Sequence, residues 1–284
     1  MMTLINETVT LKNGYFMPKL GFGTHGIDSA DAFKIITDAL NVGYRHFETA
    51  PIYLNEKEIA KAFKAASIPR ESLFITSKIP PHIKTSDGVN RVVKRIMKNL
   101  DVDYLDCLLI NAPTPWGKED EDFSNENIEV YKAMEQLYKD EIIGSIGLSN
   151  FRIQDIDALL PHIDITPHVH QIGVFIGHTL DAIVDYSKTN GMVIQGHSPL
   201  ARGRILNNDL VNDYARKETI TPARLAIRYV IEKGVYPVTK ASDLKRMKDN
   251  INVDSPLQPE TIQALDNFNK DVRDYLPPKA KWVL

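Results

Sequence analysis

The chain has 284 residues, of which 43% are hydrophobic and 25% charged, and its formal net charge is −3. This balance is typical of a globular protein, and the length is ample for a sizeable core. No excess of positive charge would attract the chain to DNA, RNA or an anionic membrane, so we expect neither nucleic acid nor membrane as a partner.

The N-terminal residues and the single cysteine predict the compartment. The first residues lack the basic and apolar regions of a signal peptide, and no apolar run approaches the ~20 residues that cross a bilayer. Cys107 is the only cysteine, so no intrachain disulfide can form, and its apolar neighbours predict a small buried side chain. These features favour a cytoplasmic protein.

The chain begins with a predicted hairpin and continues as alternating strands and helices. The hairpin pairs residues 9–11 with 15–17 around the turn Lys12-Asn13-Gly14. Short β-branched runs predict strands over residues 20–23, 44–47, 73–77, 104–110, 142–148, 168–172, 192–197 and 235–238. Helical patterns lie between them: one that Ser29 or Asp28 caps and Gly43 ends, then 56–66, an apolar stripe from Val89 to Leu100, 128–138, 153–160, 180–189, 222–233, and one beginning near Asp243.

Eight strand–helix units favour a closed barrel over an open doubly wound sheet. Their period of ~30 residues is that of a βα unit. No linker-like tract divides the chain, and we therefore predict a single (β/α)8 TIM barrel domain over residues 1–284, with a short N-terminal β-hairpin. Active groups of such barrels lie at the C-terminal ends of the strands. No helix carries a sustained heptad seam, so we expect a monomer.

Two chemically active side chains follow the second and third predicted strands. Tyr53 carries a phenol, and a lysine ammonium within a few ångströms favours phenolate, so we expect Lys78 to lower the pKa of Tyr53. Glu48 could pair with Lys78 and hold it in place. Such a trio would make Tyr53 a proton donor near neutral pH. Spacing alone leaves a second interpretation open, in which Tyr53 is a loop aromatic and Lys78 a surface charge.

Residues 45–56, RHFETAPIYLNE, resemble the signature of the aldo-keto reductases, R-x-I-D-T-A-x-x-Y-x-N-E. Further similar segments follow in order at residues 11–24, 74–78, 101–111, 146–151, 170–172, 197–203, 221–235 and 239–250. The ordered set covers nearly the whole chain. The resemblance implies a barrel that binds NADPH, with NADH possible, and transfers hydride to the carbonyl of an aldehyde or ketone.

The resemblance also implies the catalytic residues. Tyr53 and Lys78 match the family's catalytic tyrosine and lysine, whereas Glu48 stands in place of an aspartate and Asn111 in place of a histidine. Tyr53 would protonate the carbonyl oxygen, and Asn111 would orient it but cannot titrate. The family's potassium-channel β subunits are similar at the asparagine position. The alternative is therefore a slow or inactive NADPH-binding redox sensor or regulatory protein.

Cofactor contacts carry over by motif position. Ser149, Asn150 and Gln171 match residues that hold the carboxamide, and His197 replaces the tyrosine on which the nicotinamide stacks. The remaining residues assigned to the cofactor are Gly23 and Thr24; Ser198, Leu200 and Arg202 of the pyrophosphate loop; Lys240 and Arg246 at the 2′-phosphate; and Asp249 and Asn250 at the adenine. Asp243 places a carboxylate where the family has a phosphate-facing hydroxyl, which weakens the preference for NADPH.

The family's substrate pocket often has three aromatic walls, whose positions here are His25, Pro80 and Ala112. The sequence therefore predicts a wider or more polar pocket for an aldehyde or ketone, with Phe151, Trp116 or Trp282 as candidate substitutes for the missing walls.

Two other motifs are weaker. Gly21 to Gly26 match the dinucleotide pattern G-x-G-x-x-G, but Pro18 interrupts the short strand before them. His168 and His170 have the spacing of metal ligands, yet no carboxylate–histidine set completes a site, so packed or rim histidines and no metal are expected.

Overall fold

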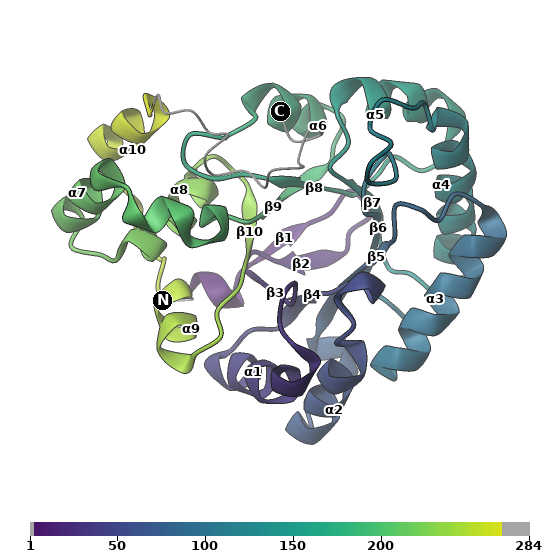
Figure 1. The fold of residues 1–284 in the computed structure, drawn as a ribbon, viewed down its shortest axis with the longest axis horizontal. Helices are drawn as coiled ribbons and strands as arrows, with labels where there is room; N and C mark the ends of the chain where they lie inside the picture. Colours follow the sequence, from purple (N-terminus) through teal and green to yellow (C-terminus); the bar gives the residue numbers. More distant parts are fainter. Residues whose placement is uncertain (1–2, 269–284) are drawn as a thin grey trace.

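The computed structural model describes residues 3–268 and has a closed parallel barrel at its centre. The strand order is β10-β3-β4-β5-β6-β7-β8-β9, which confirms the predicted eight-stranded (β/α) barrel (Figure 1). The strands are β3 (Gly21–Gly23), β4 (His46–Glu48), β5 (Phe74–Ile79), β6 (Cys107–Ile110), β7 (Ile146–Ser149), β8 (Val169–Gly173), β9 (Val193–His197) and β10 (Tyr236–Thr239).

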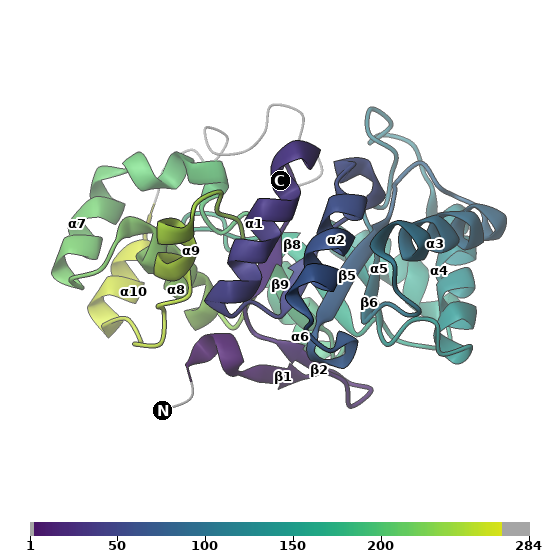
Figure 2. The same ribbon diagram turned by 90° about the horizontal axis from the view of Figure 1, so that it is seen from below.

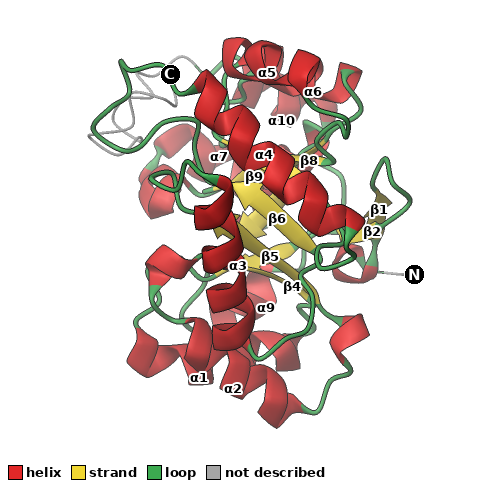
Figure 3. Ribbon diagram, turned by 90° about the vertical axis from the view of Figure 1, so that its right-hand side faces the viewer, coloured by secondary structure: helices red, strands yellow, loops and turns green. Residues whose placement is uncertain are grey.

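Helices surround the barrel, as Figure 3 shows with strands inside and helices outside. They are α1 (Ser29–Val42), α2 (Glu56–Ala66), α3 (Ser86–Leu100), α4 (Ser124–Lys139), α5 (Ile153–Leu159), α6 (Asp181–Thr189), α7 (Asp209–Lys217), α8 (Pro222–Glu232), α9 (Leu244–Asn250) and α10 (Pro259–Asp266). Sequence analysis missed α7 and α10. No helix among the described residues is long and apolar enough to cross a membrane.

Local signals explain where the predicted helices begin and end. Gly43 ends α1 with φ +115°, a left-handed conformation that glycine adopts without strain, and Asp28 stands at its N-terminal cap. The side chain of Thr85 caps α3 by accepting a hydrogen bond from the backbone of Gly88. The predicted apolar stripe of α3 is buried in the core at Val89, Val92, Val93, Ile96 and Leu100.

The N-terminal hairpin closes one end of the barrel. Strands β1 (Thr8–Thr10) and β2 (Phe16–Pro18) pair antiparallel, one residue from their predicted bounds, and lie beneath the barrel in Figure 2. Met17 and Leu11 pack in one cluster with Phe74 and Val169, the first residues of β5 and β8. The hairpin thus covers the N-terminal ends of the strands, and the accessible mouth lies at their C-terminal ends.

The barrel also settles the glycine-rich segment at Gly21–Gly26. β3 pairs in parallel with β4 on one side and β10 on the other, so this segment is a barrel strand and not the first strand of an open dinucleotide-binding sheet. A β-carbon at Gly23 would lie 2.9 Å from the Val238 side chain, so this glycine is needed for packing between β3 and β10.

Candidate active site

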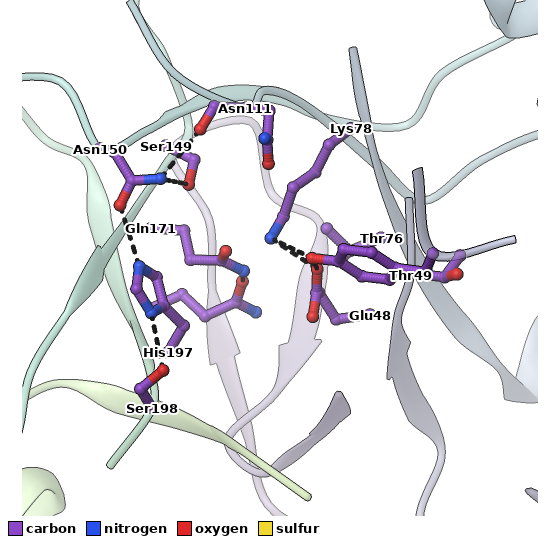
Figure 4. A network of polar contacts seen from close by, with 12 residues as sticks. Glu48, Thr49, Thr76, Lys78, Asn111, Ser149, Asn150, Gln171, His197 and Ser198 are labelled. Atoms are coloured by element: carbon purple, nitrogen blue, oxygen red, sulfur yellow. Dashed lines mark hydrogen bonds and ion pairs between the residues drawn. The ribbon is translucent and has the colours of Figure 1, made fainter. Parts of the chain in front are cut away.

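Tyr53, Lys78 and Glu48 converge at the mouth of the barrel. The Lys78 ammonium lies 2.6 Å from Glu48 Oε1 and donates to the Tyr53 hydroxyl at 3.3 Å. That hydroxyl donates to the same Glu48 oxygen at 3.1 Å. Figure 4 shows the Lys78 ammonium beside the Glu48 carboxylate. The charged pair is almost closed to solvent, with 6% of the Lys78 side chain and 4% of the Glu48 side chain exposed. Removing either residue would leave the other as an unpaired buried charge.

Neighbouring strands and a short turn bring this cluster together. Glu48 ends β4 and Lys78 lies near the end of β5, its partner in the sheet. Tyr53 ends a 3₁₀ turn (Pro51–Tyr53) that follows β4, and Leu54 leaves it in a left-handed conformation at φ +58°. The ring of His25 packs edge-on against Tyr53, with centroids 5.0 Å apart. Strand ends therefore fix the charged pair, and the turn positions the phenol above it.

The electrostatic effect on Tyr53 is opposite to the expected one. Burial raises the pKa of Tyr53 well above 10, and the Glu48 carboxylate, which faces the hydroxyl, raises that pKa further. Lys78 does lie close, but its charge is paired with Glu48. The expectation that Lys78 lowers the pKa of Tyr53 is therefore wrong for this structure, and the phenol stays protonated at neutral pH.

Asn111 contacts a second group of polar side chains at the strand ends. It follows β6 and is buried, and its backbone oxygen accepts a hydrogen bond from Asn150 Nδ2 at 2.9 Å. Asn150 Nδ2 also donates to Ser149 Oγ at 3.1 Å, and Asn150 Oδ1 lies 2.9 Å from His197 Nε2. Since both amide hydrogens are used, Asn150 Oδ1 must accept, and His197 must carry its proton on Nε2.

His197 is held as a neutral ring. Burial first, and then the positive charges of Lys78 and Arg202, lower the pKa of His197 to about 3. Its Nδ1 is 3.2 Å from the Ser198 hydroxyl, which acts as donor to the neutral ring. Asn150 and Ser198 both have left-handed backbones, at φ +60° and +57°, a conformation that costs about 1 kcal/mol and is concentrated at functional sites.

Two of the residues assigned to a cofactor carry buried oxygens without a hydrogen-bond partner. They are Thr24 Oγ1, after β3, and Gln171 Oε1, on β8. An unpaired buried acceptor costs about 1–3 kcal/mol, so each oxygen favours a ligand that brings a donor. Gln171 lies between His197 and Lys78 in Figure 4. The residues present therefore fit a bound group with amide and hydroxyl donors.

The other residues assigned to the cofactor from the sequence lie between β9 and α9. Arg202 is exposed in the turn after β9, and Leu200 is partly buried beside it. Lys240 donates to the backbone oxygen of Gly26 at 3.3 Å, and Arg246 is paired with Asp243 at 3.2 Å. Asp243 also caps α9, since its side chain accepts from the backbone N–H of Arg246.

The two residues assigned to the adenine differ in environment. Asp249 accepts a hydrogen bond from Thr221 Oγ1 at 2.5 Å, and this bond ties α9 to the start of α8. Asn250 is buried at the end of α9.

The predicted pocket residues do not share one environment. His25 is exposed beside Tyr53, whereas Pro80 and Ala112 are buried after β5 and β6. Phe151 packs in the main hydrophobic core and Trp116 is 50% exposed. Phe151 therefore cannot replace a missing aromatic wall, because its ring is committed to the core. Trp282 lies outside the described residues.

Sequence analysis missed Gln195 and His46, two polar residues inside the barrel below Gln171. Gln171 Nε2 donates to Gln195 Oε1, and Gln195 Nε2 lies 3.2 Å from His46 Nε2. Each of the two lies two residues before a predicted site residue, His197 or Glu48, on the same strand. Because strand side chains alternate between faces, this spacing was the signal that they point inward.

The remaining candidates are structural. His168 accepts a hydrogen bond from the backbone of Ile146, and His170 lies 2.8 Å from the Ser187 hydroxyl. In residues 3–268 no group of three or more His, Cys, Asp or Glu side chains is placed to hold a metal ion. Cys107 is buried as expected, and burial raises the pKa of its thiol to about 12.

Comparison with known proteins decides the family. A model of the Aldo/keto reductase family matches residues 19–270. The chain belongs to the aldo/keto reductase family. A solved aldo/keto reductase structure from Brucella melitensis superposes with a TM-score of 0.88 at 28% identity, over 95% of this chain and 100% of that one.

Curated relatives of this aldo/keto reductase are named as enzymes that reduce carbonyl compounds. Glyoxal reductase of Bacillus subtilis is 32% identical over 275 residues, which cover 96% of each chain. Methylglyoxal reductase DkgA of Escherichia coli O157:H7 is 32% identical over 256 residues, covering 88% of this chain and 89% of the relative. Aldehyde reductase YPR1 of Saccharomyces cerevisiae is 30% identical over 295 residues, covering 94% and 93%. The chain is accordingly an oxidoreductase.

Proposed function

We propose that this aldo/keto reductase reduces the carbonyl of an aldehyde or ketone, with NADPH as the hydride donor. The observation that supports the proposal best is the Glu48–Lys78–Tyr53 cluster, which presents a protonated phenol at the mouth of the barrel. The monomeric state and cytoplasmic location of the protein stay predictions from the sequence.

In this mechanism the chain's own residues manage one proton. Reduced nicotinamide, when bound, supplies hydride to the carbonyl carbon. Tyr53 donates its hydroxyl proton to the carbonyl oxygen as negative charge develops there, and Asn111 donates a hydrogen bond that orients that oxygen. Lys78 stabilises the phenolate that is left, because its ammonium lies 3.3 Å from the Tyr53 oxygen.

The nicotinamide end of the cofactor would lie between two groups of side chains. Ser149, Asn150 and Gln171 would hold the carboxamide, because their amide and hydroxyl groups offer both donors and acceptors. His197 would stack on the ring, since the neutral imidazole is fixed by Asn150 and Ser198.

The phosphates would lie on the rim. Arg202 would face the pyrophosphate, and Lys240 and Arg246 the 2′-phosphate, where a guanidinium matches phosphate oxygens. Asp243 holds Arg246 and carries a negative charge. NADH should therefore also bind, but less tightly than NADPH.

We infer that the substrates are small α-dicarbonyl compounds. Two of the curated relatives are named for glyoxal and methylglyoxal. At the mouth of this barrel an exposed histidine, His25, replaces one aromatic wall, and a second carbonyl oxygen could accept its N–H.

The test follows NADPH absorbance with glyoxal, methylglyoxal, aromatic aldehydes and simple ketones. We expect steady consumption, fastest with the two dicarbonyls, and slower consumption with NADH. Tight NADPH binding with no turnover above buffer across the panel would contradict the proposal. That result would favour a redox sensor. Two features would then explain slow turnover: the Tyr53 hydroxyl is hydrogen-bonded to Glu48, and Asn111 cannot titrate.

A further inference from the structure

A line of hydrogen bonds runs inside the barrel from the hairpin to the proposed carboxamide site. His46 Nδ1 lies 3.4 Å from the backbone oxygen of Pro18, at the end of β2. His46 Nε2 lies 3.2 Å from Gln195 Nε2, and Gln195 Oε1 accepts from Gln171 Nε2. Gln171, Gln195 and His46 are 0%, 1% and 1% exposed, so these bonds are closed to bulk solvent.

The Pro18 carbonyl at the start of this line determines which group donates in each of the following hydrogen bonds. A backbone carbonyl can only accept, so His46 carries its proton on Nδ1. Its Nε2 then accepts, with the Thr76 hydroxyl at 3.0 Å and Gln195 Nε2 at 3.2 Å as its donors. Gln195 must then turn its NH2 group toward His46 and its oxygen toward Gln171. Gln171 in turn donates through its NH2 group, and its own oxygen is left without a partner. Burial, which lowers the pKa of His46 to about 4, keeps the ring neutral at physiological pH.

We propose that Gln195 and His46 are positioning residues that fix the amide of Gln171 with its oxygen, and not its nitrogen, available to the NH2 group of the cofactor's carboxamide. The inference rests on the proposed function, because it requires a nicotinamide cofactor. It also predicts a binding preference: the site should bind a nicotinamide ring that carries an amide more tightly than a ring whose substituent has no N–H donor.

A glutamine amide that its neighbours do not hold has no fixed orientation. An amide can rotate by 180° and exchange its oxygen and nitrogen with little change in shape. Without Gln195, the Gln171 side chain could present either group to the carboxamide. Gln171 Oε1 is buried and has no hydrogen-bond partner, so it favours a ligand that brings an N–H donor.

The test uses Gln195→Met, which keeps side-chain length and volume but removes both hydrogen-bonding functions. Three ligands are titrated by fluorescence and calorimetry. The first is NADPH, and the second is its reduced 3-acetylpyridine analogue, in which a methyl group replaces the amide NH2. The third is the part of NADPH that ends at the second ribose and therefore lacks the nicotinamide ring. We expect the wild-type chain to bind NADPH about tenfold more tightly than the acetylpyridine analogue, the size of one hydrogen bond.

In Gln195→Met this preference should shrink to about twofold or less, while affinity for the ring-free fragment stays unchanged. Unchanged fragment binding also shows that the variant is folded. The comparison of the two complete ligands on wild-type protein needs no variant, and equal affinities there would overturn the inference.

Two failures are distinguishable. If the wild-type chain binds neither NADPH nor the fragment, the proposed function fails and the inference with it. If NADPH binds and is consumed, but Gln195→Met keeps the full tenfold preference, the positioning role alone is wrong.

Discussion

The Glu48 carboxylate adds to the effect of burial on the Tyr53 phenol. That carboxylate reaches both the Lys78 ammonium, at 2.6 Å, and the Tyr53 hydroxyl, at 3.1 Å. The proton that Tyr53 would give to a substrate therefore points at a carboxylate when no substrate is bound. Burial and this carboxylate together raise the pKa of Tyr53, which keeps the proton on the phenol but also opposes its release.

Glu48→Asp should withdraw the carboxylate from Tyr53 while keeping a partner for Lys78. The pKa of Tyr53 then moves back toward 10, and the competing hydrogen bond is weakened. We expect kcat to rise about fivefold, the equivalent of ~1 kcal/mol. The check is kcat with a saturating dicarbonyl, with Glu48→Gln as control, which should be slower because Lys78 loses its counter-charge. An Asp variant slower than wild type would contradict this account.

Asp243→Ser tests the control of cofactor preference at one position. Serine caps a helix as well as aspartate does, so α9 should keep its start. The change removes a negative charge and frees Arg246, whose partner is Asp243 at 3.2 Å. We expect affinity for NADPH to rise about threefold to tenfold and affinity for NADH to change little. Equal gains for both cofactors in binding titrations would argue that Arg246 does not meet the 2′-phosphate.

Residue types at the site could be predicted from the sequence, but their contacts could not. Tyr53, Lys78 and Glu48 were found because strand ends meet at the mouth of a barrel and because the motif matched. The pKa of Tyr53 was predicted in the wrong direction, because spacing does not reveal that Glu48 reaches the hydroxyl or that the phenol is partly buried. The role of Phe151 was wrong for a similar reason, since its ring packs in the core.

At the scale of elements, close packing between strands sets the shape of the barrel. Gly147 in β7 leaves no space for a side chain, because a β-carbon there would lie 2.1 Å from the backbone oxygen of Val169 in β8. Gly173, at the end of β8, makes room for the ring of His197, whose Cε1 would be 3.1 Å from an added β-carbon. These glycines connect strand packing with the position of the proposed stacking residue.

Gly147→Ala should destabilise the barrel by about 3 kcal/mol, since the backbone of β7 or β8 has to shift to accept the methyl group. Denaturant unfolding measures the loss. Gly117→Ala is the control: its methyl group meets nothing within 4 Å, so only the strain of φ +85° remains, at about 1–2 kcal/mol. A smaller loss for Gly147 than for Gly117 would contradict the packing argument.

The number and order of the strands were predictable, and their exact bounds were not. Eight apolar runs gave eight strands, but β6 begins at Cys107 and not at residue 104, because Leu105 makes only an isolated bridge with Ile143. Hydrophobic periodicity shows burial and does not show where a ladder starts. The helices α7 and α10 were missed, because they extend beyond the simple strand–helix alternation.

At the scale of the whole molecule, buried neutral histidines couple stability to pH. Burial is the largest cause that lowers the pKa of four of them: His46, His168 and His170 to about 4, and His197 to about 3. An unfolded chain has histidines near pKa 6.5. Below pH 6.5 the unfolded chain therefore binds protons that the folded chain excludes, and this contribution to stability is lost as pH falls from 6.5 toward 4.

We expect the free energy of unfolding to fall between pH 7 and pH 5, with about four protons taken up by these histidines on unfolding. His170→Asn should lower that uptake by about one proton, because asparagine keeps a group near the Ser187 hydroxyl but does not titrate. Denaturant unfolding at pH 7, 6 and 5 gives the slope. An unchanged slope in the variant would show that His170 is protonated in the folded chain.

The central claim is that the Tyr53 hydroxyl gives its proton to the substrate beside bound NADPH. The most direct measurement compares Tyr53→Phe with wild type, following NADPH consumption with methylglyoxal and NADPH binding by fluorescence on the same samples. We predict turnover lower by ~10²–10⁴-fold with NADPH affinity unchanged within about twofold, because removing one hydroxyl leaves the carboxamide and phosphate contacts in place. A phenylalanine variant that turns over at the wild-type rate would contradict the account.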